Sequence, residues 1–335
     1  MSKILFFGEP LLRISPTNPS HFTDQVTSQI FYGGSEVNIA RNLQAFGQNT
    51  KLAIALPTNS IGDSFIQFLQ AAQIDTLHVQ RVGERIGIYF LENAFGCRQG
   101  EVTYDRAHSS LHDFSTENLD YDSLFVDVDH FHFSGITIAL SQQVRTSLRQ
   151  LLEEAKKRGI TISLDLNFRS KLISPLDAKH IFSEFAHYAD ICFGIEPLMA
   201  TSEDTSFFNR ELATPALIHR RMQDLMAVFG FKSIFHTVRS TDNLGRNVYQ
   251  AYMASSDGDF VTSKELKTAV LQRVGSGDAF VAGALYQLKK ASTPQEIVDF
   301  AVASATLKCT IEGDNMFESA YRVEQVLNQA KDIIR

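Results

Sequence analysis

Short apolar segments alternate along the chain with segments whose apolar residues recur every three or four positions. Residues 4–8 are apolar and end in glycine, as expected of a strand buried on both faces. Residues 33–43 have a helical period, with Ser35 as the expected N-cap. A second strand and a second helix follow, over residues 51–56 and 61–72. This alternation predicts an α/β fold, in which helices cover both faces of a mostly parallel sheet.

The alternation lapses over two segments in the first third of the chain. Residues 85–92 and 101–106 have mixed polarity and aromatic side chains, which favours two strands joined by a turn. Residues 11–32 also lack a helical period. We therefore expect a small β-sheet lid, formed by about residues 9–34 and 84–108, inserted in the main unit.

The alternation then resumes and continues to the end of the chain. The expected strands cover residues 130–133, 160–166, 190–193, 233–238 and 248–253, and the expected helices cover residues 142–157, 178–186, 217–229, 277–290, 294–308 and 321–334. We find no internal repeat and no long linker. The sequence thus predicts one domain over residues 1–335, with about nine parallel-type strands.

Composition and charge exclude several classes of protein. The chain has 335 residues, of which 44% are hydrophobic, so it can bury one large core. A net charge of −7 argues against general nucleic-acid binding. Cys97, Cys192 and Cys309 lie far apart, which favours reduced thiols over a zinc site. The N-terminal apolar run is too short for a signal peptide or a membrane span, so we expect a cytoplasmic protein that binds no membrane.

A glycine-rich stretch ends in an aspartate just before a late helical segment. Gly275 and Gly277 allow a tight turn that exposes backbone N–H groups, and the following helix adds a partial positive charge. Such a cup binds anions, most often phosphate. The carboxylate of Asp278 would repel a phosphate that stays bound in this cup. Its presence makes sense if the phosphoryl group is only being transferred there and Asp278 accepts a proton from the group that attacks it. The alternative is an ordinary loop with Asp278 as a helix cap.

Two distant motifs decide between these interpretations. Gly33-Gly34 with Asn38 and residues 40–42 form the early motif, and Gly275-Ser276-Gly277-Asp278 forms the late one. In order and spacing they resemble the motifs of the PfkB family of ribokinase-like sugar kinases. Within that family, the chain is most similar to 2-keto-3-deoxygluconate kinases, on the evidence of Gly8-Glu9, residues 104–107, 165–169, 237–239 and 273–275, and residues 312–315.

The resemblance implies a doubly wound α/β domain and ATP-dependent transfer of a phosphoryl group, with Mg²⁺, to a primary hydroxyl of 2-keto-3-deoxygluconate, giving the 6-phosphate. It implies that Asp278 is the base and that the backbone of Gly275, Ser276 and Gly277 is the anion hole. The implied substrate contacts are Gly34, Asn38, Tyr89, Tyr104, Arg106, Arg169 and Asp314. The expected cofactor side comprises Asp165, Asn167 and Arg239, together with Gly275 and Gly277.

The chemistry of the arginines supports a sugar acid as the substrate. A carboxylate is best held by paired guanidinium N–H donors, which Arg106 and Arg169 would supply. A neutral sugar would not need them, so a kinase for a neutral sugar of the fructose or ribose type is the first alternative. An ordinary carboxylate pKa suffices for Asp278, because a loose transition state needs little early deprotonation.

Two positions depart from the family pattern. Residues 194–198 stand where many members have an Asn-x-x-Glu motif that organises Mg²⁺, and only Glu196 remains as a metal ligand or as a solvated loop residue. This change motivates the second alternative, a sugar-binding regulator without catalysis. Gln272 replaces the usual Asp two residues before Val274, which weakens the case for the family's monovalent cation. Residues 202–214 have no assigned role, and the lid suggests a homodimer.

Overall fold

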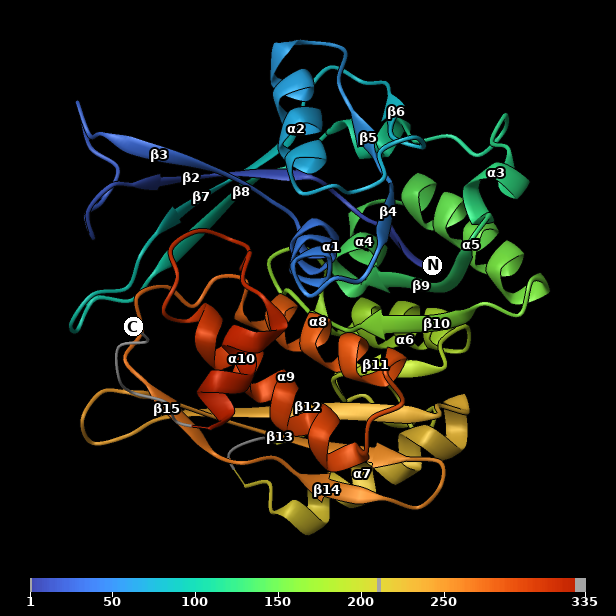
Figure 1. The fold of residues 1–335 in the computed structure, drawn as a ribbon, viewed down its shortest axis with the longest axis vertical. Coiled ribbons are helices and arrows are strands. Elements are labelled where there is room, and N and C mark those ends of the chain that lie inside the picture. Colours follow the sequence, from blue (N-terminus) through green and yellow to red (C-terminus); the bar gives the residue numbers. More distant parts are fainter. Residues whose placement is uncertain (1, 210–211, 329–335) are drawn as a thin grey trace.

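The large sheet has six parallel strands and an antiparallel edge. The computed structural model describes residues 2–209 and 212–328. The parallel strands lie in the order β4 (Thr50–Ala53), β1 (Lys3–Phe7), β9 (Val128–Ser134), β10 (Thr161–Asp165), β11 (Ile191–Phe193) and β12 (Ser233–Thr241). Next to β12 lies the antiparallel β13 (Asn247–Ser255), which pairs with β14 (Phe260–Thr262) and β15 (Leu266–Thr268) (Figure 1).

Each strand of the parallel part buries side chains on both faces, because successive residues point to opposite sides. On β1, Ile4 and Phe6 enter one core cluster, and Leu5 and Phe7 enter the other. The first face is covered by α1 (Ser35–Ala45), α2 (Ser60–Ala71), α8 (Ser276–Lys289), α9 (Pro294–Lys308) and α10 (Ala320–Leu327). The second is covered by α3 (Tyr121–Phe125), α4 (Gly135–Leu140), α5 (Gln142–Lys157), α6 (Pro175–Ala186) and α7 (Pro215–Phe229). The predicted doubly wound α/β fold is confirmed.

The order of the strands creates a crevice next to β1. The chain passes from β1 to β4 on one side, and later returns to place β9 on the other. Open α/β sheets bind ligands at the carboxyl ends of strands where the order reverses in this way. Gly8 follows β1 and Ser134 ends β9, so both lie at this crevice.

A second sheet of four strands, which we call the lid, extends from the main body (Figure 1). Its strands lie in the order β3 (Ser28–Gly33), β2 (Leu11–Pro16), β7 (Gly87–Glu92) and β8 (Glu101–Asp105). The central pair is parallel and the two outer pairs are antiparallel. A second, small sheet built from these two segments agrees with the fold class expected from the sequence.

Several element predictions need correction. The expected strand over residues 51–56 is divided between β4 and β5 (Ala55–Leu56), and β5 pairs with β6 (Gln80–Arg81) in a separate ladder. The strand over residues 248–253 is antiparallel, because the five residues between β12 and β13 are too few for a crossover connection. The 3-10 turn η1 (Ser110–Asp113), α3 and α4 were not expected. The last helix is described as Ala320–Leu327, and the rest of its expected span from residue 329 lies outside the described residues.

The start of α1 also differs from the expectation. Gly34 is the N-cap, and no side chain caps this helix. Ser35 is instead the first helical residue, and its hydroxyl donates to Asp278 on α8. The sequence pattern located the start of the helix to within one residue, but it assigned the wrong partner to the serine.

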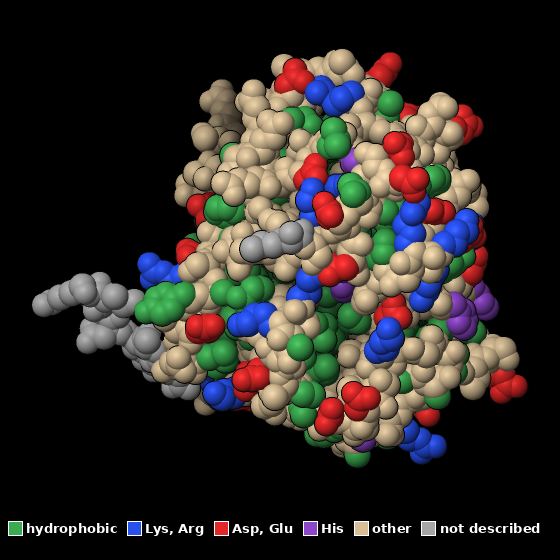
Figure 2. Space-filling model, turned by 45° about the vertical axis from the view of Figure 1, so that its right-hand side comes forward, with side chains coloured by type: hydrophobic (Ala, Val, Ile, Leu, Met, Phe, Trp, Pro, Cys, Tyr) green, Lys and Arg blue, Asp and Glu red, His purple; other side chains and the backbone are tan. Residues whose placement is uncertain are grey.

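The surface carries charges of both signs. Acidic and basic side chains are interspersed over the face shown in Figure 2. Some of the solvent-accessible charges form pairs, such as Arg158 with Asp122 at 2.7 Å. Within residues 2–209 and 212–328, no helix combines the length and the apolar character that a membrane crossing requires.

The junction of β9 and α4 generates a stability prediction. A Cβ on Gly135 would lie 2.1 Å from the Leu166 carbonyl oxygen and 2.3 Å from the buried Phe182 ring. We expect Gly135→Ala to lower the free energy of unfolding by about 1–3 kcal/mol, measured by denaturant titration, because neither neighbour can move easily. Gly277→Ala is the matched control, since no atom lies within 4 Å of its added Cβ. Equal stability of the two variants would contradict this account of the junction.

Candidate active site

Helix α8 begins on a turn that only glycine can make. Gly275 has φ of 76°, in the left-handed region, and a Cβ there would lie 1.7 Å from the backbone oxygen of Asp314. Ser276 is the first helical residue, so the first amides of α8 lack partners within the helix. Apart from the chain neighbours and the backbone of α8 itself, no atom of the described residues lies within 4 Å of a Cβ built on Gly277. The turn therefore leaves an open, positively polarised helix end.

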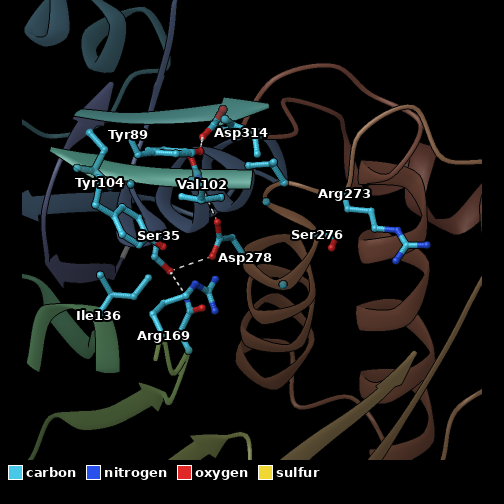
Figure 3. Close-up of a pocket in the computed structure, with 18 of the residues that line it drawn as sticks. Ser35, Tyr89, Val102, Tyr104, Ile136, Arg169, Arg273, Ser276, Asp278 and Asp314 are labelled. Atoms are coloured by element: carbon cyan, nitrogen blue, oxygen red, sulfur yellow. Dashed lines mark hydrogen bonds between the residues drawn. The ribbon is translucent and has the colours of Figure 1, made fainter. Parts of the chain in front are cut away.

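This helix end forms one wall of a cavity of about 270 Å³ between the lid and the main body. The seven residues expected to contact the sugar line it: Gly34, Asn38, Tyr89, Tyr104, Arg106, Arg169 and Asp314. So do Gly275, Ser276, Gly277 and Asp278 (Figure 3). The structure thus brings together residues from the lid, α1, the loop after β10, α8 and the loop after α9.

A larger cavity of about 700 Å³ adjoins the first one. Asn167, Arg169, Arg239 and Gly277 line both cavities. Asp165 and Glu196 line only the larger one, together with aromatic side chains that include Phe193, Phe207, Phe208, Phe235 and Phe280. Of the residues expected on the cofactor side, Asn167, Arg239 and Gly277 therefore lie where the two cavities meet, Asp165 lies in the larger cavity, and Gly275 lines only the smaller one.

Asp278 is held by two neutral donors from α1. Ser35 Oγ donates to Oδ1 at 2.9 Å, and Asn38 Nδ2 donates to Oδ2 at 2.8 Å (Figure 3). Asn167 Nδ2 donates in turn to Ser35 Oγ at 3.0 Å. Asp278 is therefore not a helix cap. Burial raises its pKa to about 6 in spite of these hydrogen bonds, which is above the ordinary carboxylate pKa that would suffice for a loose transition state.

Two further carboxylates lie within electrostatic reach of Asp278. Burial raises the pKa of Asp165 to about 7, and the charge of Asp278 adds to the rise. Burial raises the pKa of Glu36 to about 6, although Ser134 and Thr137 donate to its Oε1 at 2.6 and 2.8 Å. All three titrate close to neutral pH, so the charge of the site depends on what it binds.

The Glu36 carboxyl group fills the space beside the end of β1. A Cβ on Gly8 would lie 2.0 Å from Glu36 Cδ, so this position accepts only glycine while Glu36 stays in place. Sequence reasoning did not select Glu36 as a site residue. The sequence feature that could have identified Glu36 is its position next to Ser35 at the start of α1.

Asp314 joins the lid to the main body. Arg13 Nε, from β2, donates to its Oδ1 at 2.6 Å, and the Tyr89 hydroxyl, from β7, donates to its Oδ2. Arg13 is fully buried and its guanidinium lies over the Phe31 ring. The charge of Asp314 is thus already compensated, which leaves its carboxylate as a hydrogen-bonding group in the wall of the smaller cavity.

The two arginines expected to bind a carboxylate have different surroundings. Arg106 Nε donates to Glu9 Oε2 at 2.6 Å, Arg106 Nη2 donates to the same oxygen, and both side chains are buried. Arg169 is exposed, and the one hydrogen bond of its guanidinium within the described chain goes to the Phe168 carbonyl at 3.3 Å. Its charge acts on Asp165 and Asp278, but no carboxylate is bonded to it among the described residues, so its donors can receive an anion, whereas Arg106 already has a carboxylate partner.

Glu196 lies in a buried ion-pair network. Lys179 Nζ contacts its Oε2 at 3.2 Å, and Arg221 Nη2 contacts its Oε1 at 3.0 Å. Both cations also pair with Asp204, and the Phe208 amide donates to Glu196 Oε1. Part of the polar segment of residues 202–214 therefore has a structural role, because Asp204 and Phe208 bond to this network. Glu196 is thus not a solvated loop residue, and both of its oxygens already have partners.

Mg²⁺ usually binds to one or two carboxylates and to substrate phosphates. Asp165 and Glu196 both line the larger cavity, and Asp165 fits this role better, because no cation is bonded to it among the described residues, whereas Glu196 is bonded to Lys179 and Arg221. Within residues 2–209 and 212–328, no group of three or more acidic, histidine or cysteine side chains is arranged as a complete metal site.

The surroundings of Gln272 do not fit a monovalent metal ion. Its Oε1 accepts from Arg13 Nη2 at 3.1 Å and from the Gly313 amide at 2.9 Å. Lys308, also fully buried, donates from Nζ to the Ile311 carbonyl at 2.9 Å in the same loop. A neutral amide and two fixed cations therefore occupy this region. Sequence reasoning noted Gln272 and named Glu9 in a motif, but it gave Glu9 no role and did not select Arg13 or Lys308.

The comparisons with known proteins agree with this geometry. The family model described as "pfkB family carbohydrate kinase" matches residues 1–228 and 245–319. A 2-dehydro-3-deoxygalactonokinase of Haloferax volcanii is 27% identical, over 97% of this chain and 96% of its own length. A 2-dehydro-3-deoxygluconokinase of Thermoproteus tenax is 25% identical over 94% and 90%. The crystal structure of 2-dehydro-3-deoxygluconokinase from Thermotoga maritima superposes with a TM-score of 0.89, at 30% identity and 98% coverage of each chain.

The ion-pair network of Glu196 generates a prediction. We expect Glu196→Gln to lower the free energy of unfolding by about 3 kcal/mol or more, because two buried cations lose an anion. The Mg²⁺ dependence of ATP binding, measured by calorimetry, should stay unchanged. Glu203→Gln, at an exposed position of the same segment, is the control and should change stability by less than about 0.5 kcal/mol. A tenfold weaker Mg²⁺ response with unchanged stability would instead make Glu196 a metal ligand.

Proposed function

Because this chain belongs to the pfkB family of carbohydrate kinases, we propose that it phosphorylates a 2-keto-3-deoxy sugar acid, and that 2-keto-3-deoxygluconate is the acceptor and its 6-phosphate the product. The chain is an ATP-dependent sugar kinase by family. The names of the relatives support a deoxy sugar acid as the substrate class, and they include both the gluconate and the galactonate epimers.

One observation carries the proposal. Asp278, residues 275–277 at the start of α8 and the guanidinium of Arg169 all line a single cavity, and the Ser276 amide donates to the Arg273 carbonyl, which leaves the amides of Gly275 and Gly277 for an anion. A carboxylate base, an anion-binding backbone and a free cation are the three groups that phosphoryl transfer to a sugar acid needs. Figure 3 shows Asp278 and Arg169 on the same side of the site, whereas the Arg273 side chain extends away from them.

The proposed chemistry follows from these positions. The primary hydroxyl oxygen of the sugar attacks the γ-phosphorus of ATP, and the bond from that phosphorus to the bridging oxygen of ADP breaks. Asp278 orients the hydroxyl and accepts its proton, which later leaves to solvent. With a pKa of about 6, Asp278 is mostly ionised at neutral pH and is a better proton acceptor than an ordinary carboxylate. The amides of residues 275–277 stabilise the charge on the phosphoryl oxygens.

The nucleotide would occupy the larger cavity, with its terminal phosphate at the junction of the two cavities. Asn167 and Arg239 line this junction, and Asp165 faces the larger cavity as the proposed carboxylate for hydrated Mg²⁺. When bound, Mg²⁺ neutralises phosphate charge. The lid, fixed by Tyr89 and Arg13, limits access of water to the acceptor side.

The role of Asp278 can be tested by its removal. We expect Asp278→Asn to lower kcat by about 10²- to 10⁴-fold, since general-base assistance is lost, while sugar binding measured by calorimetry is largely retained. In the unmodified protein kcat/KM should rise with pH through about 6. Asn38→Ala should move that midpoint upward, because the lost donor stabilises the ionised form. Near-normal turnover of Asp278→Asn would rule out the assigned base.

The substrate class can be tested through Arg169. A panel of keto-deoxy acids, including both epimers, and of neutral sugars should show a preference for the acids. We expect Arg169→Ala to raise KM for the acid by about 10- to 100-fold, because a charge-assisted contact is lost, with little effect on any residual neutral-sugar activity. Arg169→Lys keeps the charge and should restore part of the affinity. A wild-type preference for fructose or ribose would reject the proposed specificity.

A further inference from the structure

Lys308 is a buried cation that the proposed mechanism does not use. It is the last residue of α9, and its side chain is fully buried. Within the part of the chain that the structure describes, its ammonium donates one hydrogen bond, to the carbonyl oxygen of Ile311 at 2.9 Å. A buried charge is costly unless it is well paired. An ammonium group with one carbonyl acceptor is therefore in need of an explanation.

The neighbouring acidic group does not compensate Lys308 fully. Among the carboxylates that act on Lys308, Asp314 has the largest effect, but its two oxygens already accept from Arg13 and Tyr89. The charge of Asp278 acts on Lys308 more weakly. Beneath the Gly275 turn, Arg13 and Lys308 thus bring two positive charges to one bonded carboxylate, which leaves an excess of positive charge there.

This excess lies directly under the proposed phosphate-binding amides. Lys308 Cε is 3.4 Å from the position of a Cβ on Gly275, and the Asp314 carbonyl lies against the same glycine. A fixed ammonium here does two things: it holds the loop after α9 against the Gly275 turn, and it adds a positive charge behind the helix end. An anion bound at residues 275–277 would supply the negative charge that compensates the Lys308 ammonium.

We propose that the Lys308 ammonium is a built-in cation that positions the Gly275 turn for phosphate, in place of a monovalent metal ion, so that this kinase works without K⁺. Gln272 supports the proposal, since its neutral amide is bonded to Arg13 and Gly313 and offers no carboxylate to a metal. The inference rests on the proposed phosphoryl transfer at residues 275–278, and it makes Lys308 a positioning residue.

The test compares cations at constant ionic strength. Wild-type turnover should differ by less than about twofold among KCl, NaCl and choline chloride, each at about 0.1 M. Lys308→Ala should weaken the binding of a non-hydrolysable Mg–ATP analogue, measured by calorimetry in choline chloride, by about 10- to 100-fold. K⁺ or NH₄⁺ should restore much of that binding, because either ion can enter the vacated space. Lys308→Met refills the space with an apolar chain, so it should lose binding without rescue.

A matched control removes a charge elsewhere. Lys290, on the exposed end of α8, has its ammonium over the Tyr286 ring, and Lys290→Ala should bind the analogue as the wild type does. Activation of the wild type by K⁺ of tenfold or more would overturn the proposal. So would unchanged binding by Lys308→Ala, or a loss that neither K⁺ nor NH₄⁺ reverses, which would assign Lys308 to support of the fold alone.

The outcomes also separate this inference from the proposed function. If Lys308→Ala does not fold, the response of the wild type to K⁺ decides the question by itself. A wild type that phosphorylates the sugar acid but requires K⁺ would reject the inference and leave the function intact. A wild type that binds the ATP analogue independently of K⁺, but phosphorylates no keto-deoxy acid, would reject the function and leave the inference intact.

Discussion

Three carboxylates, the buried Glu36 and Asp278 and the half-buried Asp165, lie within electrostatic reach of one another at the carboxyl edge of the large sheet, and the free-energy cost of ionising them governs the site. Asp278 and Glu36 are stabilised by hydroxyl and amide donors rather than by bonded cations, so their pKa values stay raised, as does that of Asp165. The fixed cations Arg13 and Lys308 lie on the other side, near Gly275 and Asp314. The site is therefore acidic beside β10 and basic beneath the helix end, an asymmetry that suits a bound phosphate with its metal.

The fold explains why these charges meet. The crevice beside β1 collects the ends of β1, β9 and β10, and α1 crosses it with Ser35, Glu36 and Asn38 on its first turns. The lid closes the crevice from above and is anchored through Arg13, Tyr89 and Arg106. Because each anchor bonds to a buried carboxylate, contacts within the protein itself hold the walls of the cavity together.

The sequence pattern predicts the helices and central strands well, because the spacing of apolar residues within each segment indicates its secondary structure. The helix over residues 142–157 has the expected bounds. β14 and β15 are three residues each, too short for a period to be visible. Partners far apart in sequence escape this reasoning: Ser35 and Asp278 are separated by 243 positions, and Arg106 and Glu9 by 97. Sequence reasoning therefore predicted that Ser35 is a helix cap and that the Arg106 guanidinium is free to bind substrate. The folded structure shows instead that Ser35 bonds to Asp278 and Arg106 to Glu9.

Asp314 has a consequence beyond its place in the wall of the cavity. Its side chain is gripped by the lid, and its own backbone oxygen rests on the Cα of Gly275. Asp314 thus connects the lid strands directly to the Gly275 turn. A shift of the lid strands would reach that turn through a single peptide unit, so the proposed acceptor site and the proposed phosphate site are mechanically linked.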